Sequence, residues 1–232
     1  AWALAQIGCQ DQSVHQRLIR LLHDSTQNQR VLIQSLSKLS VFAALSTITP
    51  LMDHEKSSVR GAAIAATIHL SGDRTRLADL ADHLYVANQM DRQSAVQDVI
   101  DAGGIELMSS LLQAPISPAF RMRAVRALVD RSSGEQLRNS ALSAVDQVLR
   151  DDPRLITVLH HYGDPLPTKL LVEGLFHPDF SRCYLSMQTL LDRDPDDVWI
   201  HVWASWDNKA YNDYGAHYFM MHLFGLMRNW NQ

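Results

Sequence analysis

The sequence repeats itself with a period of about 30 residues. Arginines lie 30, 32 and 31 residues apart, at Arg30, Arg60, Arg92 and Arg123. After each arginine, small and apolar residues recur at a spacing close to 3.6, and a second amphipathic stretch precedes the next arginine. One pair of such helices cannot bury both of its apolar faces, whereas stacked pairs can. The repeat therefore predicts an all-α fold, an α-solenoid of helical hairpins.

Glycines mark the ends of several expected helices. Gly72, Gly104 and Gly134 follow the repeated arginines by 11 or 12 residues, and Gly8 closes the first segment in the same way. Glycine suits a helix C-terminus because it adopts the left-handed conformation without a Cβ penalty. The opening residues resemble the second half of a helix, so we expect further repeats to precede them in the full protein.

The composition changes near residue 150. Of 17 aromatic residues, 13 lie from Tyr162 onward, and so do six of 11 histidines if His160 and His161 are included. We therefore expect repeats over residues 1–150 and an aromatic- and histidine-rich helical region over residues 151–232 that continues the solenoid. A solenoid normally ends in a cap with a polar outer face. This end is expected instead to pack or bind something large and aromatic.

Charge and composition exclude several classes of protein. The chain has 21 basic and 25 acidic side chains, a net charge of −4, and no basic stripe, which argues against nucleic acid as a partner. No apolar run approaches the roughly 18 residues that a membrane span needs, and no signal peptide is visible. Two distant cysteines, Cys9 and Cys183, predict neither a disulfide framework nor a zinc site. We expect a globular cytoplasmic protein.

Two helices near the end form an expected hairpin with aromatic stripes. A helix over 197–206 and another over 211–227 are separated by a turn at 207–209. Each helix presents three aromatic residues on one face: Trp199, Trp203 and Trp206, then Tyr211, Tyr214 and Tyr218. The stripes are either a cap that seals the solenoid or an aromatic groove for a conjugated ligand, and some rings can serve each role.

A second candidate is the segment from His160 to Pro167, which two prolines keep out of a helix. His160, His161 and Tyr162 either face a concave surface or belong to a polar linker. Neither this histidine pair nor His217 and His222, five residues apart, has the spacing of a helical zinc pair, so we assign no metal. Cys183 is expected to be a buried structural thiol.

The repeats resemble short HEAT-like repeats. Together with the aromatic tail, they resemble the E/F-type phycobilin lyases of the phycoerythrin group. The segments that carry the resemblance are 2–8, 59–72, 160–171 and 211–218. It implies a C–S bond-forming lyase that binds a linear tetrapyrrole such as phycoerythrobilin and attaches it through a thioether to a cysteine of a phycobiliprotein subunit. The tetrapyrrole is then the substrate, with no further cofactor. Some relatives work with a second HEAT-repeat subunit.

Isomerising members of that family often carry the motif Asn-His-Cys-Gln-Gly-Asn. This chain lacks it, so the motif gives no support for isomerase activity, although other isomerising members do without it.

The chemistry of a bilin suggests roles for the tail residues. Asp207 or Asp213 would accept hydrogen bonds from pyrrole N–H groups, and Tyr214 or His217 would act as a general acid. The expected bilin-binding residues are His160, His161, Tyr162, Trp199, Trp203, Trp206, Tyr211 and Tyr218. Two alternatives remain: a non-enzymatic HEAT-repeat scaffold, and a HEAT-like DNA glycosylase, which the acidic charge disfavours.

Overall fold

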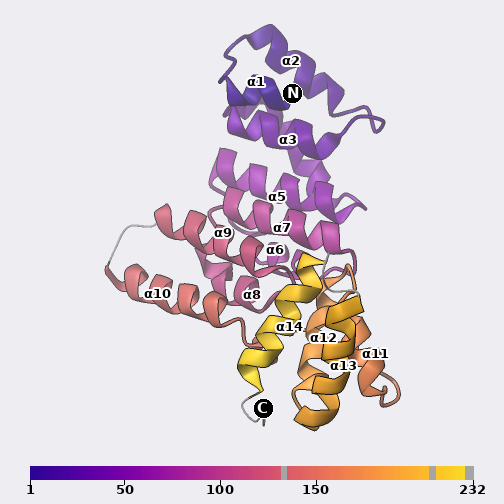
Figure 1. Cartoon of the computed structure of the whole chain (residues 1–232). Helices are drawn as coiled ribbons and strands as arrows, with labels where there is room; N and C mark the ends of the chain where they lie inside the picture. Colours follow the sequence, from indigo (N-terminus) through magenta and orange to yellow (C-terminus); the bar gives the residue numbers. More distant parts are fainter. Residues whose placement is uncertain (132–134, 209–212, 228–232) are drawn as a thin grey trace. The chain divides into compact units, whose positions relative to one another are not determined.

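A computed structural model describes residues 1–131, 135–208 and 213–227, excluding the side chains of 135–140, 207, 208 and 214, and shows no strand among them (Figure 1). In chain order the helices are α1 (Trp2–Gln6), α2 (Gln12–Leu21), α3 (Gln29–Lys38), α4 (Leu45–Ile48), α5 (Ser57–Ser71), α6 (Asp79–His83), α7 (Gln89–Asp101), α8 (Met108–Gln113), α9 (Pro118–Asp130), α10 (Glu135–Arg150), α11 (Thr168–Gly174), α12 (Phe180–Leu190), α13 (Pro195–Asn208) and α14 (Tyr214–Leu226). Short 3-10 turns accompany them: η1 (Phe42–Ala44), η2 (Thr49–Asp53), η3 (Ile105–Leu107) and η4 (Pro153–Leu155). The expected all-α class is confirmed.

The chain divides into two compact units. The first unit comprises residues 1–112 and 118–148, and the second comprises 113–117 and 149–232. In the first unit each odd-numbered helix packs on the next odd-numbered one: α1 on α3, α3 on α5, α5 on α7 and α7 on α9 (Figure 1). The intervening helices pack beside them, as α2 does on α3 and α6 on α7. This order is consistent with an α-solenoid.

Alanines let the helices at the centre of the first unit approach closely. Helix α5 packs against both α3 and α7, and its Ala62, Ala63 and Ala66 are almost completely buried. Larger side chains on the neighbouring helix, such as Ile33 and Leu36, fill the space around them. The apolar residues that produce the 3.6 period are therefore the core of the stack.

Two of the repeated arginines, Arg60 and Arg92, hold their helix to the loop before it. The guanidiniums of Arg60 and Arg92 both donate to the carbonyls five and six residues earlier, at 2.8–3.4 Å. In the next repeat the buried arginine is Arg121, which donates to the Leu112 carbonyl at 3.3 Å. The structural equivalent in this last copy is therefore Arg121, whereas the sequence alignment pairs Arg123 with the other arginines.

The glycine signals are partly confirmed. Gly72 ends α5 with a φ of 78°, and Gly8 follows α1 with a φ of 66°. After α7 the left-handed residue is Gly103 (φ 60°), one position before the expected Gly104. The fourth glycine, Gly134, lies outside the described residues.

The second unit has its own core. Helices α11, α12 and α13 pack together, and α14 contacts α12. Tyr184, Met187 and Phe219 are fully buried at its centre, in a cluster of apolar side chains from all four helices. No helix in the described part of the chain is both long and apolar enough to cross a membrane.

Candidate functional site

Helices α13 and α14 pack against each other as expected, but the described rings of α14 that meet the tryptophans are those of His217 and Phe224, whereas Tyr218 of the expected tyrosine stripe bonds elsewhere. The Trp206 ring lies 4.1 Å from the ring of His217, and the Trp199 ring lies 5.0 Å from that of Phe224. Because the contacts join the end of α13 to the start of α14 and the reverse, the two helices run antiparallel. Both helix boundaries differ from the expected 197–206 and 211–227 by one to three residues.

The three tryptophans of α13 have different environments. Trp206 packs against the core of the second unit, and Trp199 is half-buried beside Phe224. Trp203 is 53% exposed and leans on Trp199, with ring centroids 5.4 Å apart. Its neighbour on the same helix, Ile200, is exposed as well. Trp203 is therefore the tryptophan of this stripe with a face open to a ligand.

Tyr218 is held by a buried carboxylate that no sequence pattern singles out. Asp151 is 1% exposed and has a φ of 44°, in the left-handed region. Its carboxylate accepts hydrogen bonds from the hydroxyls of Tyr218 and the buried Tyr184. Its carbonyl accepts a third from His222 Nε2 at 2.9 Å, and the His222 ring stacks on Tyr218. Asp151 thus connects α12 and α14 through hydrogen bonds to side chains of both helices.

The segment from His160 to Pro167 is irregular, as expected, and α11 starts directly after it. Tyr162 hydrogen-bonds Ser186 on α12 at 2.8 Å, and His160 Nδ1 lies 3.2 Å from the Ser181 hydroxyl. Both side chains fasten the loop to α12, while His161 is exposed.

The expected catalytic residues are only partly described. The Asp213 carboxylate accepts the Ala216 amide at 2.9 Å and so caps the N-terminus of α14. His217 is half-buried against Trp206. The side chains of Asp207 and Tyr214, and Tyr211 as a whole, lie outside the described residues.

Cys183 is a buried structural thiol, as predicted. It is 2% exposed, and its Sγ donates to the His177 carbonyl at 3.0 Å. Burial, with a smaller contribution from Asp179, raises the pKa of this thiol to about 12.

A groove of about 420 Å³ lies on the first unit, and none of the expected catalytic or ligand-binding residues that the structure describes lines it. Helix α5 provides its floor through Ala62, Ala65 and Ala66, which leave space because they carry only a methyl group. Trp2 of α1 and Lys38 of α3 form one side. The Lys38 ammonium lies 5.4 Å from the centre of the Trp2 ring, over its face.

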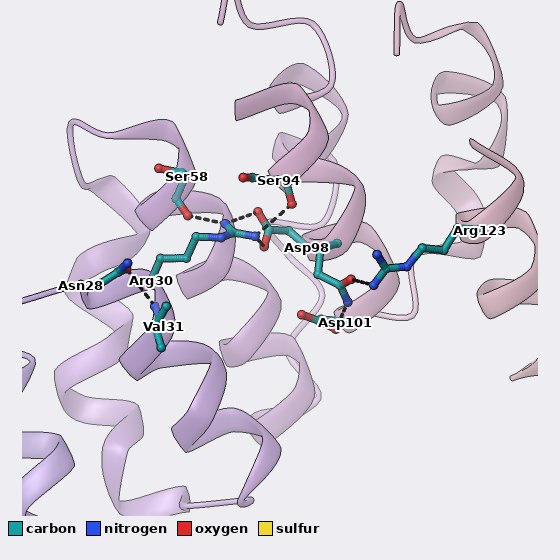
Figure 2. Close-up of polar contacts among 9 residues, drawn as sticks. Asn28, Arg30, Val31, Ser58, Ser94, Asp98, Asp101 and Arg123 are labelled. Carbon is teal, nitrogen blue, oxygen red and sulfur yellow. Dashed lines mark hydrogen bonds and ion pairs between the residues drawn. The ribbon is translucent and has the colours of Figure 1, made fainter. Parts of the chain in front are cut away.

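The opposite side of the groove is a chain of polar groups from α7 and α9. Figure 2 shows Asp101 and Arg123 near each other; the Gln97 amide joins them, donating to Asp101 at 2.7 Å and accepting from Arg123 at 2.6 Å. Arg131, which donates to the Ile100 carbonyl, completes this side. Burial raises the pKa of Asp101, and the hydrogen bond from Gln97 and the charge of Arg131 oppose that shift.

A buried ion pair fixes the helices that carry the groove. The Arg30 guanidinium donates to both carboxylate oxygens of Asp98, at 2.9 and 2.7 Å, and also to the carbonyls of Ser58 and Ser94 (Figure 2). One side chain of α3 is thereby bonded to both α5 and α7. Burial raises the pKa of Asp98 to about 7, against the opposing effect of Arg30.

Gly61 makes room for this ion pair. A Cβ at Gly61 would lie 2.5 Å from Asp98 Oδ2 and 2.9 Å from Nδ1 of His83. His83 accepts a hydrogen bond from Arg60 Nε at 3.0 Å, and burial together with the charge of Arg60 lowers its pKa. The imidazole is therefore neutral in the fold, with Nε2 as the acceptor.

The polar residues of the groove share a register that is visible in the sequence. Lys38, His69 and Asp101 each follow a repeated arginine by eight or nine residues, and Arg131 follows Arg123 by eight and its structural equivalent Arg121 by ten. Positions that recur once per repeat line the same surface of a solenoid. This register is the signal that could identify the groove, whereas the accumulation of aromatic residues points to the second unit.

Two curated proteins match this chain over almost its whole length. Bilin biosynthesis protein CpeY of Synechococcus sp. (strain WH8020) is 35% identical over 230 residues, which is 99% of this chain. Uncharacterized phycocyanin operon protein Y of Pseudanabaena tenuis (strain PCC 7409) is 31% identical over 98% of it. The chain belongs to the E/F-type phycobilin lyase family. It spans about half the length of these relatives, 55% in each case. No family model matches the sequence of this phycobilin lyase homologue.

Proposed function

We propose that this chain is the bilin-binding part of a phycobilin lyase. It would bind a linear tetrapyrrole, phycoerythrobilin in the first instance, and promote its attachment to a cysteine of a phycobiliprotein subunit. The observation that carries the proposal is 35% identity over 99% of the chain to a protein named for bilin biosynthesis. Its helix pairs are then HEAT-like repeats, and the cytoplasm, where phycobiliproteins are built, is the proposed location.

The proposed reaction is the addition of a thiol to a carbon–carbon double bond. The sulfur of the acceptor cysteine bonds to the outer carbon of the ring A ethylidene group, and a proton is delivered to the ring carbon, so that no group leaves and nothing is oxidised. Much of the acceleration would come from holding the double bond near the thiol. His217 and Tyr214 are the proposed acids.

Asp213 and Asp207 are the carboxylates proposed to accept the pyrrole N–H groups. For Asp213 the cap on α14 is a competing role, because the oxygen bonded to the Ala216 amide is the one that stabilises the helix. Asparagine caps helices as well as aspartate does but carries no charge. Asp213→Asn therefore removes the negative charge and keeps the helix cap, whereas Asp213→Ala removes the charge and the cap.

The deciding experiment mixes the purified chain with phycoerythrobilin and records absorbance and fluorescence. The expected result is a red-shifted, sharpened and fluorescent spectrum, which a Trp203→Ala, Tyr214→Ala variant weakens. Asp213→Asn is expected to lose the shift while keeping the wild-type helix content, measured by circular dichroism. Adding an acceptor subunit should then give a covalent adduct that survives denaturation.

The relatives are longer than this chain, so the same mixture is repeated with a candidate second HEAT-repeat subunit. A spectrum that remains that of free bilin in both mixtures contradicts the proposal and favours the non-enzymatic scaffold. Wild-type transfer by Asp213→Asn would instead remove only the role of the Asp213 carboxylate, and the same result with Asp207 and Asp213 both replaced would remove the carboxylate proposal.

A further inference from the structure

We propose that the groove of the first unit is the binding site for the conjugated backbone and the two carboxylates of the tetrapyrrole. This inference rests on the proposed function but gives it a different location: the bilin lies in the groove instead of on the aromatic tail, and the tail variants named above would then leave bilin binding unchanged. The site would take a planar, conjugated dicarboxylate and hold it between the Trp2 side and the arginine side. None of these residues belongs to the aromatic tail.

The shape of the groove suits a flat ligand. Its floor on α5 consists of Ala62, Ala65 and Ala66, which are only 2–3% exposed and reach no farther than Cβ. Trp2 is 53% exposed at one side and offers a ring on which a conjugated system can stack. The volume of about 420 Å³ falls within the range of small-molecule sites, about 300–1,000 Å³.

The charges of the groove suit two carboxylates. Lys38, Arg123 and Arg131 contribute three positive charges, and Asp101 contributes one negative charge, which leaves an excess of two. The chain as a whole has a net charge of −4, so this local excess is opposite in sign to the rest of the molecule. Asp101 lies between the arginines and can accept an N–H donor of the ligand.

Gln97 positions the arginine that we expect to bind a carboxylate. Its amide oxygen accepts a hydrogen bond from Arg123 Nη2 at 2.6 Å, and its amide nitrogen donates one to the Asp101 carboxylate. A guanidinium has five N–H donors in a fixed fork, so the bond to Gln97 fixes the plane in which the other donors lie. Arg131 is anchored in a similar way by its bond to the Ile100 carbonyl.

The test compares phycoerythrobilin with its dimethyl ester, in which both carboxylates are blocked. We expect the wild-type chain to bind the free acid more tightly than the ester. The double variant Arg123→Gln, Arg131→Gln should bind the acid about 10- to 100-fold more weakly, with little change for the ester. Trp2→Ala should weaken both ligands equally, because it removes a stacking surface and no charge.

The matched control is Arg126→Gln, which removes an exposed arginine of the same helix that pairs with Asp130 and does not line the groove. It should bind like the wild type. Arg123→Lys, Arg131→Lys keeps both charges and should restore most of the preference for the acid. Circular dichroism of every variant checks that the fold is retained.

The outcomes separate the two proposals. If the wild type binds neither ligand, the proposed function fails and the site fails with it. If the wild type binds bilin and the double glutamine variant keeps the same acid-to-ester ratio, the groove is not the carboxylate site while the proposed function stands. Equal wild-type affinity for acid and ester also overturns the carboxylate assignment.

Discussion

The absence of a side chain at Gly61 is what allows a charged pair to lie between three helices. The Asp98 carboxylate and the His83 imidazole would both be within 3 Å of a Cβ at this position, and both are buried. The first group is bonded to Arg30 and the second to Arg60. Neither can move aside without breaking a buried hydrogen bond.

We therefore expect Gly61→Ala to destabilise the first unit. Alanine is favoured in a helix over glycine by about 1 kcal/mol, but overpacking a core costs about 1–3 kcal/mol. The clash should outweigh the gain, with a net loss of up to about 2 kcal/mol in urea unfolding. Gly225→Ala is the control, because a Cβ there meets nothing within 4 Å. An equal or higher stability of Gly61→Ala would show that the pair can relax.

Replacing Arg30 by glutamine is expected to make stability depend on pH. The variant leaves the Asp98 carboxylate buried without its guanidinium, a loss of about 3–5 kcal/mol at pH 8. Without Arg30 the folded pKa of Asp98 rises above about 7, farther above its unfolded value. The folded state then binds the proton more tightly, so its stability rises as the pH falls toward the unfolded pKa.

The difference in unfolding free energy between wild type and Arg30→Gln should therefore shrink as the pH falls from 9 to about 7, where Asp98 takes up its proton in the variant only. Below about pH 7 Asp98 is protonated in both proteins, so the difference should level off. Urea titrations at several pH values measure it directly. A difference that does not shrink between pH 9 and pH 7 would mean that removing Arg30 leaves the pKa of Asp98 unchanged.

At the scale of helices, Asp151 connects elements that are far apart in the sequence. It lies 33 residues before Tyr184 and 67 before Tyr218, and its backbone is in the left-handed conformation. Such a position favours asparagine, aspartate or glycine over alanine. The carboxylate also satisfies the hydroxyl of Tyr184, which is fully buried.

Asp151→Ala is expected to destabilise the second unit by about 2–4 kcal/mol, from the strained backbone and the unsatisfied Tyr184 hydroxyl. Asp151→Asn keeps an acceptor oxygen and tolerates the backbone, so it should lose less than half as much. Hydrogen exchange of α12 and α14, with denaturation curves, distinguishes the variants. Equal losses for both would contradict the backbone contribution.

The helical period predicts elements well because it reports burial directly. The repeated arginines and apolar stripes locate α3, α5, α7 and α9, since each of these helices buries a face on the next. The period does not give exact ends: hydrogen bonds of loop residues decide them, as at Gly103. Nor does it reveal Asp151, because a single carboxylate that bonds two distant tyrosines leaves no periodic trace.

At the scale of the whole molecule, the two units provide two different candidate surfaces for one ligand. The second unit has the exposed Trp203, and the first unit has the groove around Ala62. Aromatic content is conspicuous in a sequence, and it points to the second unit, where Trp206 and Tyr184 turn out to be core residues. The groove combines one tryptophan with charged residues carried by α3, by α7 and by α9 and the residue that follows it, so only the repeat register indicates it.

Hydrogen exchange with and without phycoerythrobilin should show which unit binds it. If the groove is the site, protection should increase in α3, α5 and α7, while α13 and α14 exchange as before. Ligand at 100 times its Kd stabilises the unit that binds it by about 2.7 kcal/mol, enough to slow its global opening. Protection confined to α13 and α14 would place the ligand on the tail instead.

The environment of Cys183 has a consequence for any protein that carries a thiol-reactive chromophore. Thiolates, rather than thiols, are the attacking species, and a pKa of about 12 leaves a fraction on the order of 10⁻⁵ ionised at pH 7. The bond to the His177 carbonyl and the surrounding core keep electrophiles away as well. A protein with a reactive thiol beside such a chromophore would attach the chromophore to itself and be inactivated after one turnover. The buried, un-ionised thiol of Cys183 is protected against this self-modification.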